Sequence, residues 1–185
     1  NVLNAIVLLE DLGAEIKEVD LPDHENILAA HQVILRTDAF AIHHENLLNY
    51  PDKWDDEVKE RILLGEEIKA FEYAQAIQTR FQTINQFDSI FEEIDVFISP
   101  TVPILPTNIE QREVEIYPGE HIRYPLIKLT SLANFIGFPS LSVNCGFSAQ
   151  GLPIGLQIIG KRLDEATVYQ FAYFIEQELS TNNFY

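Results

Sequence analysis

The stretch GLPIGLQIIGKR, residues 151–162, decides the fold of this chain. Gly155 is followed, after four residues, by Gly160 and a lysine, which approaches the spacing of a phosphate-binding loop. Arg162 stands where that motif needs a Ser or Thr hydroxyl for Mg²⁺, and the intervening residues are mostly apolar with two β-branched side chains. We therefore predict a buried strand, entered through a Gly-Leu-Pro turn, left at Gly160 and followed by a helix that Asp164 caps.

Helical and strand-like patterns alternate along the rest of the chain. Apolar residues recur every three or four positions in the expected helices, and a stripe of phenylalanines between Phe71 and Phe91 is expected to face the core. Helices are predicted at residues 2–12, 26–48, 55–68, 69–93, 127–137 and 164–179, and strands at residues 16–19, 95–100, 139–147 and 153–160. This alternation predicts an α/β fold with a mixed β-sheet flanked by helices, mainly helical over residues 1–94 and strand-rich over residues 95–185.

The composition excludes several classes of protein. The formal net charge of −17, from 12 basic and 29 acidic residues, makes nucleic acid an unfavourable direct partner, because that affinity comes from Lys and Arg. No apolar run reaches the length of a membrane span, and no secretory leader is recognisable, so we expect no membrane partner. The single cysteine, Cys145, excludes an internal disulfide framework. We expect a cytoplasmic protein.

No complete catalytic or metal-binding motif is recognisable in the sequence. His43 and His44 are adjacent and lack the second ligand of an HExxH pattern, so no metal site is expected. The chain has no GxSxG turn around any serine, and Cys145 lies in an apolar stretch where a small buried side chain is the ordinary interpretation. The proline-rich segment TVPILPTN, residues 101–108, follows a predicted strand, which is where α/β proteins place ligand contacts.

Three longer stretches resemble the amidase signature family. DVFISPTVP at residues 95–103 and the segment at residues 129–168 resemble the carboxyl-terminal region of that family. They contain its P-T-x-P loop, then A-N-x-x-G-x-P, C-G-F and G-L-P-I-G-L-Q-I-I-G in the same order. The segment VKERILLGEEIKAFEYAQAIQTR, residues 58–80, looks like the helical stretch that precedes them. The resemblance implies the carboxyl-terminal part of an amidase signature α/β/α fold, with the glycines of residues 151–162 bracketing a core strand.

The resemblance also implies an activity. Family members hydrolyse carbon–nitrogen amide bonds through a Ser, cis-Ser, Lys triad and a covalent acyl-enzyme, without metal or organic cofactor. The triad serines lie in a Gly- and Ser-rich segment that these 185 residues lack, and the chain begins at Asn1 and contains no methionine. We therefore expect residues 1–185 to be a carboxyl-terminal fragment of an amidase domain. The fragment would supply scaffold and pocket wall, carry no catalytic residue and be inactive alone.

Four residues are expected to bind substrate in the intact protein. The resemblance places Thr101 and Pro103, in the loop after the strand, and Asn134 closest to a small-molecule amide. Arg61 occupies a helical position where some family members hold a substrate carboxylate, a task that suits a guanidinium group. The structural alternatives are an exposed helix arginine near Glu57 and, for Asn134, a helix-end asparagine.

Three functions remain open at this point. The first is a hydrolase of small or hydrophobic amides. The second is the A subunit of a glutamine-dependent tRNA amidotransferase, in which the stretch before A-N usually reads close to DIFTVP. Here residues 127–132 read IKLTSL, without the acidic residue. The third is a non-catalytic interaction domain on the same fold. Exposed strand edges lead us to expect self-association, giving a homo-oligomer.

Overall fold

The structure is a computed structural model that describes residues 1–181 and contains two compact units. One unit comprises Asn1–Asp20 and the chain from Phe87 onward, and the other comprises Leu21–Gln86. The first unit holds a three-stranded sheet with helices around it, which confirms the predicted α/β fold class. The single domain over residues 1–185, with its helical and strand-rich parts, stays a prediction.

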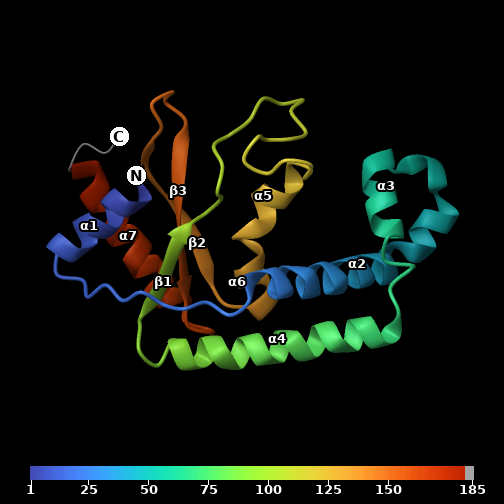
Figure 1. Ribbon diagram of the computed structural model, residues 1–185, viewed down its shortest axis with the longest axis horizontal. Coiled ribbons are helices and arrows are strands. Elements are labelled where there is room, and N and C mark those ends of the chain that lie inside the picture. The colour runs from blue at the N-terminus through green and yellow to red at the C-terminus, as the bar shows by residue number, and fades with distance from the viewer. Residues whose placement is uncertain (182–185) are drawn as a thin grey trace. The chain divides into compact units, whose positions relative to one another are not determined.

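The sheet has the order β1-β3-β2, so the strand predicted from residues 151–162 lies at its centre (Figure 1). Its strands are β1 Val96–Pro100, β2 Ser140–Phe147 and β3 Pro153–Gly160. β3 pairs antiparallel with both neighbours, whereas we expected a mixed sheet. The last five residues of β3 are all buried, which explains its nearly continuous apolar run. Gly151, with φ of 76°, provides the left-handed residue in the turn between β2 and β3.

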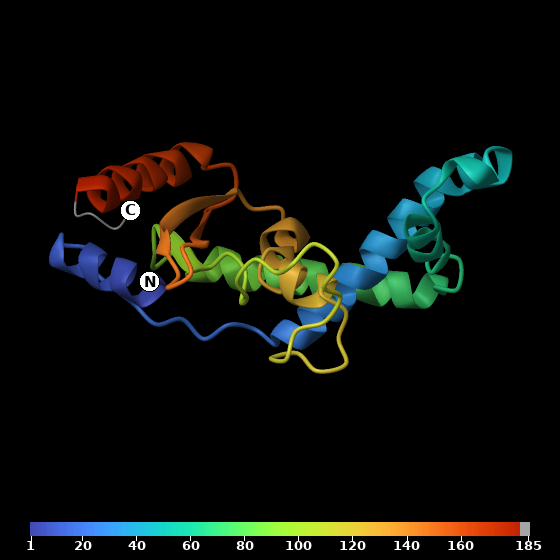
Figure 2. The same ribbon diagram turned by 90° about the horizontal axis from the view of Figure 1, so that it is seen from above.

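Two helices cover one face of the sheet, α1 Val2–Asp11 and α7 Glu165–Thr181 (Figures 1 and 2). Alternate residues of β3 point to this face, and Leu156 and Ile158 are fully buried there. The buried core of this face consists of Ala5, Leu9, Cys145, Leu156, Ile158, Val168, Ala172, Ile175 and Leu179. The helix predicted after residues 151–162 is confirmed, and its cap is the Asp164 carboxylate, which accepts a hydrogen bond from the Thr167 amide at 3.3 Å.

The opposite face of the sheet carries an aromatic cluster. Phe87, near the end of α4 Ala70–Ile90, makes edge-to-face contacts with Phe97 of β1 and Phe138, with ring centroids 6.3 and 6.5 Å apart. Phe91 and Phe87 are buried, as predicted for the phenylalanine stripe. Phe71 and Phe81 of the same stripe are 58 % and 62 % exposed, because a stripe at helical spacing is buried only where another element packs on it.

The structure corrects two of the predicted elements. Residues 16–19, predicted as a strand, lie in an irregular segment, since alternation makes a strand only when a neighbouring strand pairs with it. The helix predicted over residues 127–137 is two short helices, α5 Arg123–Lys128 and α6 Ser131–Ile136. Between them the Thr130 and Ser131 hydroxyls donate to the carbonyls of Ile127 and Lys128, a local bond that competes with a continuous helix. α6 ends at Gly137, which has φ of 73°.

The unit of Leu21–Gln86 is helical. It contains α2 His24–Asn49, the short η1 Pro51–Lys53, α3 Asp56–Leu63 and most of α4. Asp23 and Asp55 cap α2 and α3, each accepting a backbone N–H three residues later. Gly65 lies so close to the Arg36 carbonyl oxygen that a side chain could not be accommodated, which places the loop after α3 directly against α2.

Candidate functional site

Polar side chains lie on one face of all three strands. In the antiparallel register Gln157 of β3 is opposite Ser99 of β1 on one side and Ser142 of β2 on the other. Residues that are paired directly across neighbouring strands point to the same face of the sheet. Side chains alternate along β3, so Gln157 and Ile159 point to the face opposite Leu156 and Ile158. The strands therefore bring three hydrogen-bonding side chains together from segments far apart in the sequence.

A pair of hydroxyl groups bridges β1 and β2. Thr101, directly after β1, and Ser142 have their hydroxyl oxygens 2.5 Å apart, and either can donate. Between them lies Gly155 of β3, where a Cβ atom would come within 2.6 Å of the Thr101 oxygen and 2.8 Å of the Ser142 oxygen. The Thr101 amide also donates to the Gly155 carbonyl at 3.0 Å. Only glycine at position 155 leaves room for the two hydroxyls to meet.

Gln157 is held on both sides of its amide group. Its Nε2 donates to the Ser140 hydroxyl at 2.9 Å, and its Oε1 is 3.5 Å from the Ser99 hydroxyl. The side chain is only 3 % exposed, so these bonds offset the cost of burying an amide among apolar residues. Because the Gln157 donor is directed at Ser140, the Ser140 hydroxyl keeps its own proton to donate elsewhere.

These groups line one side of a pocket of about 230 Å³, and the region around α6 lines the other. Thr130 and Ala133 are half-buried and buried, while Asn134 is exposed at its rim. The pocket is lined by Thr101, Thr130, Ala133, Asn134, Ser140, Leu141, Ser142 and Gln157. None of these lining residues, all within the described part of the chain, has an ionisable side chain.

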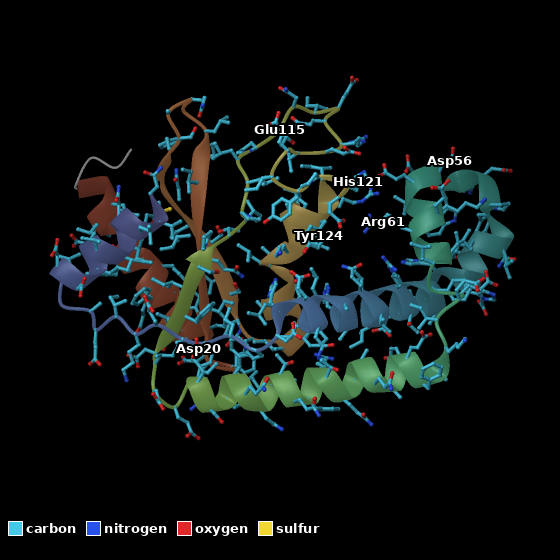
Figure 3. The ribbon with its side chains drawn as sticks, viewed as in Figure 1. Asp20, Asp56, Arg61, Glu115, His121 and Tyr124 are labelled. Atoms are coloured by element: carbon cyan, nitrogen blue, oxygen red, sulfur yellow. The ribbon has the colours of Figure 1, made fainter. Side chains whose placement is uncertain are left out.

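The structure brings together two of the four residues predicted to bind substrate. Thr101 and Asn134 both line the pocket. Pro103 lies half-buried in the same loop as Thr101 but is not a lining residue. Arg61 is exposed in the last turn of α3, in the unit of Leu21–Gln86 (Figure 3). Their assignment to substrate stays a prediction.

The sequence patterns missed four polar residues of the pocket: Thr130, Ser140, Ser142 and Gln157. One signal was available, because a glutamine inside an otherwise apolar central strand must find hydrogen-bond partners. Ser140 and Ser142 alternate along β2, so they share a face, but the sequence does not tell which face meets the glutamine. The strand register, which is a tertiary property, decides the pairing.

A basic and aromatic cluster lies on α5 and the loop before it. The Lys128 ammonium donates to the Tyr124 hydroxyl at 3.1 Å and lies 5.2 Å and 5.5 Å from the ring centroids of Tyr124 and Tyr117 (Figure 3 labels Tyr124). These contacts stabilise the ammonium over the faces of the rings. They keep the Lys128 ammonium beside Tyr117 and Tyr124, and Lys128 is not among the residues that line the pocket.

Two other groups considered in the sequence have structural roles. The Cys145 side chain is fully buried in the core of α1 and α7, and burial raises the pKa of its thiol, which disfavours a thiolate nucleophile. Arg162 forms an ion pair with Asp88 at 3.2 Å and lies over the Phe138 ring. Neither residue is arranged for nucleophilic attack or for phosphate binding.

Residues 1–181 contain neither a metal-binding cluster nor a membrane-spanning helix. No group of three or more His, Cys, Asp or Glu side chains within this range could hold a metal ion. In the same range no helix combines the length and the apolar character that crossing a bilayer requires.

Comparison with known proteins identifies relatives of the chain. Residues 1–169 match the family model described as Amidase. The chain is 34% identical, over 96% of its length, to the A subunit of the glutamyl-tRNA(Gln) amidotransferase of Bacillus cytotoxicus, and it spans 41% of that relative. The chain thus spans about two fifths of the length of the curated relatives that it matches.

Solved structures share the fold. One, described as an amidase, superposes with a TM-score of 0.84 at 27% identity, covering 95% of this chain and 41% of that one. A bacterial aryl acylamidase described as an amidase signature enzyme superposes with a TM-score of 0.80 at 22% identity, covering 99% of this chain and 40% of that one, which shows the fold alone. With the family model matched along residues 1–169 and the sheet superposed on solved amidases, this chain belongs to the amidase family, the amidase signature enzymes.

Proposed function

We propose that this chain forms the carboxyl-terminal part of an amidase, a hydrolase of carbon–nitrogen bonds other than peptide bonds. The observation that carries the proposal is the family match over residues 1–169, which includes every strand of the sheet and every residue of the pocket. In the intact enzyme a Ser, cis-Ser, Lys triad would form a covalent acyl-enzyme that water then hydrolyses. Residues 1–185 would supply scaffold and pocket wall, without metal or organic cofactor.

The chemistry of the pocket supports the proposal that this chain alone is inactive. A serine attacks an amide carbonyl only when an adjacent base takes its proton and N–H donors stabilise the oxyanion. The Ser142 hydroxyl has the Thr101 hydroxyl as its partner, and the lining residues include no lysine or histidine that could serve as base. We assign contacts with the substrate to Thr101, Pro103 and Asn134, and we assign the binding of a substrate carboxylate to Arg61.

A second candidate is the A subunit of a glutamine-dependent tRNA amidotransferase. The curated relatives at 31–34% identity carry that name, which favours this reading. Ile127 on α5 argues against this function. The resemblance leads us to expect, at this position, an acidic residue that binds the amino group of glutamine. In this reading the partners would be the other subunits of the assembly. A non-catalytic interaction domain on the same fold is the third reading, and no observation favours it.

Ammonia release decides between the two enzymatic readings. The full-length gene product that carries these residues should release ammonia from isobutyramide, a neutral branched amide, faster than from glutamine. The separately expressed 185-residue chain should release none from either compound. Release from glutamine alone would support the amidotransferase reading, and no release from either compound by the full-length product would contradict both enzymatic readings.

Location and assembly are further parts of the proposal. We expect a cytoplasmic protein, because the single cysteine lies buried without a disulfide partner. We expect self-association of the chain, because within residues 1–181 β1 and β2 each have one side without a strand partner. Light scattering that shows a monomer at high protein concentration would contradict the second expectation.

A further inference from the structure

We infer that residues 112–122 form a strap that the Lys128 ammonium holds closed on α5. The strap is one compact loop, and the charge of Lys128 decides how often it opens. It follows the loop that contains Thr101 and Pro103, so the same charge limits how freely that loop moves. The inference does not depend on the proposed function, because it concerns contacts within this chain.

The strap is closed at its base and turns sharply at its tip. The Ile122 amide donates to the Arg112 carbonyl at 2.6 Å, so the two ends of the strap lie side by side. At the tip the Glu120 amide donates to the Tyr117 carbonyl at 3.2 Å, and Gly119, with φ of 78°, is the third residue of this turn. A short loop with adjacent ends and its own internal bonds can open as one unit while the rest of the fold stays intact.

Few side chains attach the strap to the rest of the structure. Between residues 111 and 120 every residue is exposed except Val114 and Tyr117, which are half-buried. The backbone bridge between these two lies within the strap and does not attach it to another element. The Tyr117 ring, in contrast, contacts the Tyr124 ring of α5 edge to face, with ring centroids 5.6 Å apart (Figure 3 labels Tyr124). A segment with so few buried contacts opens easily, so the contacts of Tyr117 carry much of its stability.

Lys128 joins the two rings with one positive charge. Its ammonium lies 5.5 Å from the centroid of the Tyr117 ring on the strap and 5.2 Å from that of the Tyr124 ring on α5. It also donates a hydrogen bond to the Tyr124 hydroxyl at 3.1 Å. The faces of both rings are negative and attract the cation, and Lys128 is half-buried, which reduces screening by water. Removing this charge should therefore weaken the hold of α5 on the strap.

The test measures hydrogen exchange by mass spectrometry in the full-length gene product that carries these residues. Each of the three Lys128 contacts, two with rings and one with a hydroxyl, is equivalent to about a threefold change in an equilibrium constant. Lys128→Met keeps an apolar stem and removes the charge, so peptides that contain the amides of Tyr117, Glu120 and Ile122 should exchange about 30-fold faster. Lys128→Arg keeps a cation over the rings and should stay within about threefold of the native protein.

Cleavage by a glutamyl endopeptidase gives an independent measure of the same opening. Glu113, Glu115 and Glu120 lie on the strap, are exposed and are unchanged in these variants. A protease needs an opened, extended segment, so its rate follows the population of the open strap. Cleavage after these residues should therefore also be about 30-fold faster in Lys128→Met.

Two further variants assign the effect to the contact between Lys128 and the strap. Lys69→Met is the matched control, because the Lys69 ammonium also lies over an aromatic ring, that of Phe71 at 6.0 Å, but in the unit of Leu21–Gln86. It should leave exchange and cleavage of the strap unchanged. Tyr117→Leu removes the ring on the strap and should open it about tenfold, and adding Lys128→Met should then increase opening less than it does in the native protein.

The outcomes decide whether the charge of Lys128 holds the strap. Faster exchange of the strap in Lys128→Met, but not in Lys128→Arg or Lys69→Met, would support the inference. Unchanged exchange and cleavage in Lys128→Met would overturn it, because the backbone bonds or other parts of the protein would then hold the strap. Equal acceleration in Lys128→Arg, or an equal acceleration of the β3 amides, would also overturn it, since the charge would not be the cause or the opening would not be local.

Discussion

Replacing Gly155 with alanine should loosen the sheet at the pocket. The new methyl carbon would lie 2.6 Å from the Thr101 oxygen and 2.8 Å from the Ser142 oxygen, far inside the optimum of about 3.5–4.0 Å for non-bonded contacts. The hydroxyls must separate, which costs about 0.5–1.5 kcal/mol for the hydrogen bond, with about 1–3 kcal/mol for overpacking. The smaller entropy of the unfolded chain offsets about 0.4–1 kcal/mol, so the net loss is about 2 kcal/mol.

Native-state hydrogen exchange is the appropriate assay because it measures local opening. In Gly155→Ala the Thr101 amide, which donates to the residue 155 carbonyl, should exchange about 30-fold faster than in the native protein. Amides of α2, in the other unit, serve as the control and should not change.

A second background tests the cause of that loss. In Thr101→Ala the nearest clashing oxygen is gone and the Ser142 side chain can rotate away, which leaves the residue 101 Cβ at 3.1 Å as the remaining close contact. Adding Gly155→Ala in this background should therefore cost only about 0.5 kcal/mol. The expected coupling between the two sites is therefore about 1.5 kcal/mol, within the range found for residues in contact. If Gly155→Ala lowers the stability equally in both backgrounds, the contact between the Thr101 and Ser142 hydroxyls is not the reason that position 155 requires glycine.

Three further predictions concern the core, a helix cap and pH. Leu156→Ala should lower the free energy of unfolding, measured by urea denaturation, by about 2–5 kcal/mol, because the side chain is fully buried under α1 and α7. The control Tyr173→Ala, at an exposed site of α7, should change it by less than about 0.5 kcal/mol. Asp164→Ala should lower it by about 1 kcal/mol through loss of the α7 cap, and Asp164→Asn should restore most of it. Burial lowers the pKa of His31, so the folded state binds fewer protons than the unfolded state between the two pKa values. The contribution of neutral His31 to the free energy of unfolding should then be fully present above pH about 6.5 and decrease as the pH falls. His31→Gln should reduce this decrease. An NMR titration midpoint of His31 at or above about 6.5 would contradict the prediction.

Most helices and strands were predictable from local patterns. The central strand follows from its apolar run between Gly155 and Gly160, and the cap of α7 follows from Asp164. The break between α5 and α6 was not predicted, because the spacing of apolar residues continues through Thr130 and Ser131 while their hydroxyls bond locally to the backbone. Residues 16–19 alternate like a strand, yet lie outside the sheet.

The sequence by itself determined the family, through motifs that are contiguous along the chain, and with it the prediction that Thr101 and Asn134 contact substrate. The structure decided which side chains share the pocket with them. Ser142 meets Thr101 only because β1 and β2 flank β3 in one register, and Gln157 meets Ser140 for the same reason. Register brings together residues that are far apart in the sequence, such as Ser99 and Gln157, which are 58 positions apart, and a local pattern carries no information at that range.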